Sequence, residues 1–141
     1  MSTSSIQERQ SALIEEFSLF DDWMDKYGMI IDLGKELKAL PAEDHKEENL
    51  IKGCQSKVWL TATKRENGNV LFHADSDAII TKGLVAIMIQ VLSDAPPQEI
   101  LKAELSFIKE LGLQEHLSLT RSNGLAAMVK QMRMYALALS S

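Results

Sequence analysis

The chain has 141 residues, of which 45% are hydrophobic and 25% charged, and we expect residues 1–141 to form one globular domain. Lys and Arg total 15 and Asp and Glu total 20, which gives a formal net charge of −5, and the longest basic run is Lys64-Arg65. This charge excludes a general nucleic-acid binder, which needs a basic stripe for phosphates, and it disfavours adsorption to an anionic membrane.

The first part of the chain predicts two amphipathic helices. Apolar residues recur at three- and four-residue spacing over residues 5–20 and again from Trp23 onward. Asp21 or Asp22 is placed to cap the second helix, because a carboxylate accepts the free N–H groups of a first turn. Pro41 is expected to end that helix.

The middle of the chain predicts a small antiparallel sheet. Residues 58–65 alternate, with Val58 and Leu60 on one face and Trp59 on the other, and residues 70–74 form the returning strand. The Asn-Gly-Asn turn between them suits a hairpin, since glycine adopts positive φ without strain. A short extended piece over residues 49–53 makes two to three strands in all.

Helices are predicted again after the sheet. The apolar run over residues 78–92 indicates a buried helix, with Asp75-Ser76-Asp77 as its cap. Pro97 suits the first turn of a further helix, and residues 101–113 supply one or two short helices. Residues 120–122 precede a last helix with an apolar stripe. Helices, then strands, then helices predict an α+β fold with a small sheet flanked by helices.

The cysteine content and the N-terminus bear on the compartment. Cys54 is the only cysteine, and small secreted domains usually carry paired cysteines, so a reducing compartment is expected. The polar start of the chain has no apolar segment of a secretory signal. The apolar run over residues 78–92 is too short to span a bilayer. We therefore expect a cytoplasmic protein, with a processed organelle protein as the alternative in a eukaryote.

Cys54 is the first candidate functional residue, and two interpretations remain open from its spacing. A lone cysteine is commonly a small buried hydrophobe. Here, however, its neighbours Gly53, Gln55, Ser56 and Lys57 are small or polar and indicate a loop. Glycine frees the backbone to present a side chain, and a nearby lysine favours the reactive thiolate.

Other site chemistries have little support in the sequence. A cysteine protease needs a base beside its thiol, and His45, His73 and His116 lie in unrelated segments. No pair of ligands has the spacing of a zinc or iron–sulfur site, and no glycine-rich phosphate loop is present. Taken alone, Arg121 at a helix start is a solvated residue, and the acidic residues 75–77 are helix caps.

Several sequence blocks, in order, resemble the SufE family of sulfur acceptors in iron–sulfur cluster biogenesis. They are residues 23–27 (Trp-Met-Asp-Lys-Tyr), 31–34 (Ile-Asp-Leu-Gly), 53–59 (Gly-Cys-Gln-Ser-Lys-Val-Trp), 75–78 (Asp-Ser-Asp-Ala), 82–84 (Lys-Gly-Leu) and 121–125 (Arg-Ser-Asn-Gly-Leu). The resemblance implies a fold shared with IscU-type cluster scaffolds. Those scaffolds hold a cluster with three cysteines, whereas this chain has one, so it looks like a sulfur carrier.

The resemblance also implies a persulfide relay. A pyridoxal-phosphate cysteine desulfurase of the SufS or Csd type would pass sulfur to Cys54, which then delivers it to a SufBCD-type scaffold. Such a protein stimulates the desulfurase but is not an autonomous enzyme, and it has no cofactor or metal of its own. Whether it is a monomer or a homodimer stays open.

Particular residues take roles from this resemblance. Cys54 would be the persulfide acceptor, and Arg121 would stabilise the thiolate or persulfide anion by its charge. Asp77 would restrain the resting loop or contact the desulfurase. The expected loop and partner-facing residues are Gln55, Ser56, Lys57 and Asp75.

Two other functions compete with this one. The first is a non-catalytic scaffold in which Cys54 is buried and structural. The second is a stand-alone sulfurtransferase of the rhodanese kind, although residues 55–58 run into a strand and leave no loop of backbone donors after the cysteine.

Overall fold

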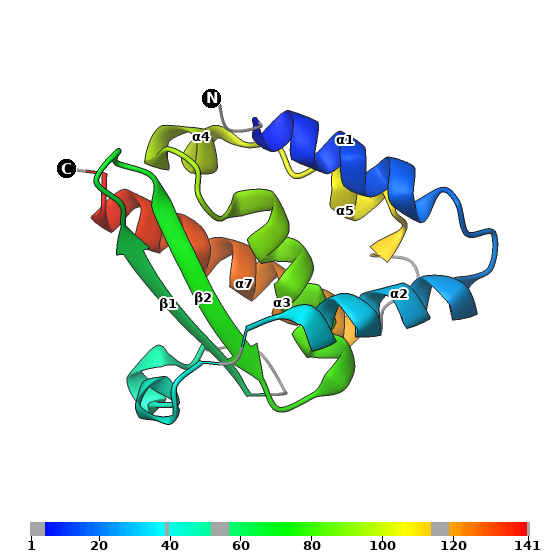
Figure 1. Cartoon of the computed structure of the whole chain (residues 1–141), viewed down its shortest axis with the longest axis horizontal. Coiled ribbons are helices and arrows are strands. Elements are labelled where there is room, and N and C mark those ends of the chain that lie inside the picture. Colours follow the sequence, from blue (N-terminus) through cyan, green and yellow to red (C-terminus); the bar gives the residue numbers. More distant parts are fainter. Residues whose placement is uncertain (1–4, 39, 52–56, 114–118, 141) are drawn as a thin grey trace.

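The structure, a computed structural model, describes residues 5–38, 40–51, 57–113 and 119–140, with only the backbone of residues 119–123 (Figure 1). Its elements are α1 (Ile6–Phe17), α2 (Trp23–Glu36), the 3-10 turns η1 (Ala42–Asp44) and η2 (Glu47–Asn49), β1 (Val58–Lys64), β2 (Val70–Ser76), α3 (Ile79–Leu92), α4 (Pro97–Lys102), α5 (Phe107–Glu110) and α7 (Leu119–Ala138). The order confirms the predicted α+β class.

The sheet is a two-stranded antiparallel hairpin within the described residues. Its register pairs Val58 with Ser76 at one end and Lys64 with Val70 at the other. Gly68 has a φ of 91° in the turn, a conformation that an L side chain rarely adopts. The extended piece expected before β1 contributes a single isolated bridge, between Leu50 and Trp59, and no third strand among the described residues.

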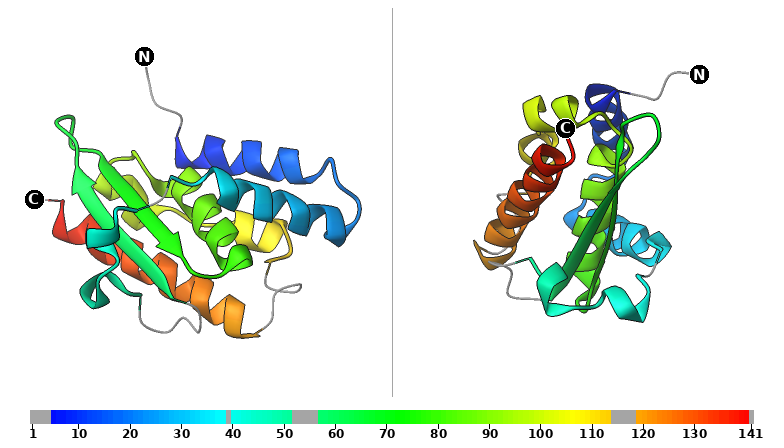
Figure 2. Two further views of the ribbon diagram at one scale, coloured as in Figure 1. Left: turned by 60° about the horizontal axis from the view of Figure 1, so that its bottom comes forward. Right: turned by 90° about the vertical axis from the view of Figure 1, so that its left-hand side faces the viewer.

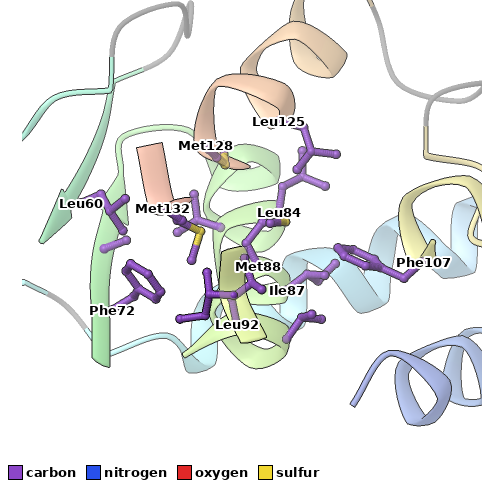
Figure 3. Packing of buried hydrophobic residues seen from close by; sticks show 14 of the residues in the cluster. Leu60, Phe72, Leu84, Ile87, Met88, Leu92, Phe107, Leu125, Met128 and Met132 are labelled. Carbon is purple, nitrogen blue, oxygen red and sulfur yellow. The ribbon is translucent and has the colours of Figure 1, made fainter. Parts of the chain in front are cut away.

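The core lies between the sheet, α3 and α7. Figure 3 shows side chains from all three elements, and Phe107 of α5, converging on one apolar cluster. Leu60 and Phe72 point inward from the sheet, while Met88 of α3 and Met132 of α7 meet them. The near-continuous apolar run of α3 is therefore explained, since α2, β2, α1 and α7 all contact this helix.

Helices α2 and α3 cross at two glycines. A Cβ added at Gly34 would lie 2.7 Å from the backbone nitrogen of Gly83, and one added at Gly83 would collide with the carbonyl of Ile30. Two helices approach this closely only where both lack side chains, which explains why both positions carry glycine. The crossing fixes the start of α3 relative to the sheet.

Three predicted boundaries are wrong. Asp75 and Ser76 do not cap α3, because they continue the β2 ladder and pair with β1; α3 begins at Ile79 without a side-chain cap. The last helix already includes residues 120–122, since α7 begins at Leu119. Finally, α2 ends before Pro41, because Leu37 has already turned extended.

Candidate functional site

Lys57 and Asp77 meet where the two strands end. The Lys57 N–H donates to Oδ1 of Asp77 at 3.0 Å, and the Asp77 N–H donates to the Lys57 carbonyl at 3.2 Å. The hydroxyl of Ser76 donates to the same carbonyl at 2.8 Å. Hence the pairing between β1 and β2 extends past the last ladder residues, and it fixes the backbone that directly follows residues 52–56.

The chain that leads into residues 52–56 is held at the same end of the sheet. The Ile51 N–H donates to the Val58 carbonyl at 2.9 Å, and Leu50 bridges Trp59. Ile51 is buried in the main core cluster. The predicted site residues Cys54, Gln55 and Ser56 lie outside the described residues, but both of their chain flanks are anchored to the strand ends.

Asp75 is the buried acid of this end of the sheet. His45 Nε2 lies 3.1 Å from one carboxylate oxygen and Lys82 Nζ lies 3.3 Å from the other. Burial acts to raise the pKa of Asp75, but hydrogen bonds from the Ser76 N–H and His45, together with the Lys82 charge, hold it below its usual value. The Asp75 side chain is thus a charged carboxylate that is held inside the protein by His45 and Lys82. Its expected part in partner binding stays a prediction.

Trp59 joins this cluster on the outer face of the sheet. Its ring lies 4.5 Å, centroid to centroid, from the ring of His45, and it is the strand partner of Asp75. Sequence reasoning missed His45 and Lys82 as members of the cluster. The pairing of Trp59 with Asp75 follows from the strand register, whereas nothing in the sequence places His45, which precedes η2, over that strand.

Arg121 is the remaining predicted site residue. It lies in the first turns of α7, and its side chain is outside the described part. The structure therefore brings Lys57, Asp75 and Asp77 together at one end of the sheet. The expected role of Arg121 stays a prediction.

The described residues offer neither a metal site nor a membrane-spanning helix. No group of three or more His, Cys, Asp or Glu side chains among them could hold a metal ion. None of the helices in the described part is both long enough and apolar enough to cross a membrane. At this end of the sheet, hydrogen bonds hold the backbone on both sides of the cysteine segment.

Comparison with known proteins identifies relatives over nearly the full length. A family model named SufE, described as an Fe-S metabolism associated domain, matches residues 11–136. An uncharacterized SufE-like protein of Rhizobium etli is 43% identical over 125 residues, which cover 86% of this chain and 84% of that protein. The solution structure of a hypothetical protein from Thermus thermophilus superposes with a TM-score of 0.76 at 17% identity, covering 93% of this chain and 95% of the other, and it supports the fold.

Proposed function

The chain belongs to the SufE family, associated with Fe-S metabolism, and we propose that it accepts persulfide sulfur from a cysteine desulfurase on Cys54. In this role it stimulates the desulfurase and then delivers the sulfur to a cluster-assembly scaffold of the SufBCD type. The pyridoxal phosphate belongs to the desulfurase, of the SufS or Csd type. The proposal places the relay in the cytoplasm.

Support for this role comes from the position of the only cysteine in the chain. Cys54 lies in the sequence between Ile51 and Lys57, and both residues are hydrogen-bonded to the same end of the sheet. A short segment between two fixed points has few conformations to lose when it docks, because its ends are already placed. A single thiol also suits a carrier better than a cluster scaffold, which needs several ligands.

The transfer step is a thiol exchange at sulfur. The thiolate of Cys54 attacks the outer sulfur of the desulfurase persulfide, so that a new sulfur–sulfur bond forms on Cys54. The sulfur–sulfur bond on the desulfurase breaks, and its own cysteine leaves as a thiolate. One bond forms and one breaks without net oxidation, and the persulfide proton stays on the transferred sulfur. The regenerated desulfurase thiolate then accepts the next sulfur, which accounts for stimulation.

The remaining site residues would serve this step without carrying the sulfur. Arg121 is proposed to stabilise the thiolate or persulfide anion by its charge. Asp77 is proposed to restrain the resting segment through Lys57, or to contact the desulfurase. Loop shape and partner contact are assigned to Gln55, Ser56, Lys57 and Asp75.

Intact-protein mass spectrometry tests the proposal directly. The protein is incubated with an active cysteine desulfurase and free cysteine, without reductant. We expect a gain of one sulfur atom that maps to Cys54 and is reversed by dithiothreitol. Cys54→Ser is the matched control, because serine keeps the size of the side chain but forms no persulfide.

Three outcomes would contradict the relay. The first is no mass gain beside a desulfurase that is active by itself. The second is full stimulation by Cys54→Ser, which would make the effect allosteric. The third is sulfur uptake from thiosulfate alone, which would indicate a stand-alone sulfurtransferase.

A further inference from the structure

Helix α7 presents a second apolar stripe beside the one that it buries in the core. Its core positions include Leu125, Met128, Met132 and Ala136, all at most 3% exposed. The apolar residues of this second stripe are Ala126, Val129, Met134 and Leu137, one position further round the helix, and the cations Lys130 and Arg133 lie among them. Within it, Met134 is 54% exposed and Leu137 is 63% exposed. Large apolar side chains that cluster on a surface commonly mark an interaction site.

This second stripe is one wall of a groove. The facing wall consists of Leu101, Leu105 and Ile108, from α4, α5 and the residues between them. The groove has a volume of about 570 Å³ and runs along α7 from Ala126 to Leu137. At 1.5 Å per residue, this span is about 16 Å, or roughly three helical turns. An open apolar channel of that length matches the apolar face of one short helix.

The groove and the strand ends of the candidate site have no lining residue in common. Figure 2 shows α7 and α1 on opposite sides of α3. None of Lys57, Asp75 and Asp77 lines the groove. An occupant of the groove would therefore contact residues other than those of the strand end that flanks the cysteine segment.

The charges at the groove are all of one sign. Among the described residues, Lys130 and Arg133 are the only charged ones that line it, although the whole chain carries a net charge of −5. Neither of them has a salt bridge to a carboxylate within the described ranges. The Arg133 guanidinium donates to the Ala103 carbonyl at 2.7 Å, while its Nε is buried and has no hydrogen-bond partner in the described part. The guanidinium is thus held at the groove with its charge unneutralised.

We propose that this groove docks an amphipathic helix of a partner protein that has carboxylates along the edge of its apolar face. Apolar residues at i, i+3 or i+4 and i+7 would fill the channel, and the carboxylates would pair with Lys130 and Arg133. Met134 suits such a site, because its flexible thioether adapts to the shape of a neighbour. A symmetric contact between two copies of this groove would bring its cations together, so a second copy is the poorer occupant.

Two synthetic helices of about four turns serve as probes. They share one leucine spacing at i, i+3, i+4 and i+7, but one carries Glu and the other Lys at the flanking positions. Binding to the full chain is followed by ¹H–¹⁵N chemical-shift changes. We expect the acidic helix to perturb the amides of residues 101–108 and 126–137 and to bind at least about tenfold more tightly than the basic helix.

Charge-reversed variants distinguish docking that depends on the groove charges from nonspecific binding to an apolar patch. The double variant Lys130→Glu with Arg133→Glu should reverse the preference in favour of the basic helix, whereas Lys35→Glu on α2 should leave it unchanged. Met134→Glu changes an exposed side chain, so it leaves the fold intact and should weaken binding of the acidic helix. Thermal unfolding of each variant checks the fold.

Several results would overturn the proposal. They are equal affinity for both helices, shifts outside α7 and residues 101–108, and a preference that the double variant leaves unchanged. Self-association through this face in sedimentation, or binding of anionic vesicles that competes with the acidic helix, would assign the groove to a second copy or to a membrane.

Discussion

Lys57 and Asp77 are joined by two hydrogen bonds of different kinds. One is accepted by the Asp77 carboxylate at 3.0 Å, and the other runs from the Asp77 backbone N–H to the Lys57 carbonyl at 3.2 Å. A substitution at Asp77 removes the first bond and leaves the second. The side chain of Asp77 therefore supplies one of the two bonds that hold Asp77 to Lys57, the residue that directly follows the cysteine segment.

Replacing Asp77 by alanine should loosen the anchor of the cysteine segment. The lost hydrogen bond contributes about 1 kcal/mol, which corresponds to roughly a fivefold change in an equilibrium. We expect Cys54 to react with iodoacetamide several-fold faster in Asp77→Ala than in the wild type, while the free energy of unfolding falls by no more than about 1 kcal/mol. Asp77→Asn keeps an acceptor oxygen and should react at nearly the wild-type rate. Unchanged alkylation combined with impaired sulfur transfer would assign Asp77 to the contact with the desulfurase instead.

Arg121→Ala should weaken stimulation of the desulfurase and leave the protein folded. If the guanidinium stabilises the persulfide anion, removing it forfeits a charge-assisted contact of about 1.5–3 kcal/mol, so stimulation should fall by about tenfold or more. The measurement is cysteine-dependent sulfide release at saturating carrier, with circular dichroism as the check of folding. Lys35→Ala, which removes an exposed cation on α2, is the control. A wild-type rate in Arg121→Ala would mean that Arg121 has no role in sulfur transfer and is only part of the first turns of α7.

The fold was predictable where the sequence pattern is local. The alternation of residues 58–65 with its Asn-Gly-Asn turn predicts β1 and β2, and the apolar run before Leu92 predicts α3. The predicted cap at residues 75–77 failed, because aspartate and serine suit a helix start as well as a strand end. Which of the two they form is decided by pairing with β1, which a local pattern does not contain.

The candidate site was predictable only in its motif residues. Lys57, Asp75 and Asp77 came from the family resemblance, and the contacts between Lys57 and Asp77 lie at the two strand ends. His45 joins Asp75 across 30 positions of sequence, and Lys82 reaches it from α3. Such contacts depend on how η1, η2 and α3 pack around the sheet. This packing cannot be predicted from the spacing of residues in the sequence.

Asp75 should make the stability of the protein depend on pH in the acid range. Its pKa is lowered in the folded state from an ordinary 3.8, so folding favours the charged form. The resulting stabilisation is complete well above pH 3.8 and is lost as the pH falls through the lowered folded-state pKa. Asp75→Asn does not titrate, so its loss of stability on acidification should be smaller than that of the wild type.

Urea unfolding between pH 7 and pH 3 measures this difference. Asp94, whose pKa is lowered mainly by Asn69 and Arg65, titrates in both proteins and so cancels in the comparison. Parallel stability curves for Asp75→Asn and the wild type would mean that His45 and Lys82 do not favour the charged carboxylate.

Two glycines of the same helix should respond to alanine with opposite signs. Gly34 and Gly28 both lie in α2, but a Cβ at Gly34 would lie 2.7 Å from the backbone of α3, whereas one at Gly28 has no atom within 4 Å. Gly28→Ala should stabilise the protein by about 0.5–1 kcal/mol, because alanine loses less backbone entropy in a helix. Gly34→Ala gains the same propensity, but it forces two packed helices apart at a cost of about 1–3 kcal/mol.

The free energies of unfolding of both variants in urea decide between propensity and packing. If Gly34→Ala were as stable as Gly28→Ala, α2 could shift away from Gly83 without loss. In that case, the close crossing of α2 and α3 would not determine the position of α3 relative to the sheet. A destabilised Gly34→Ala that transfers sulfur more slowly even under fully folding conditions would show that the crossing also positions the strand end, through Lys82 and Asp75.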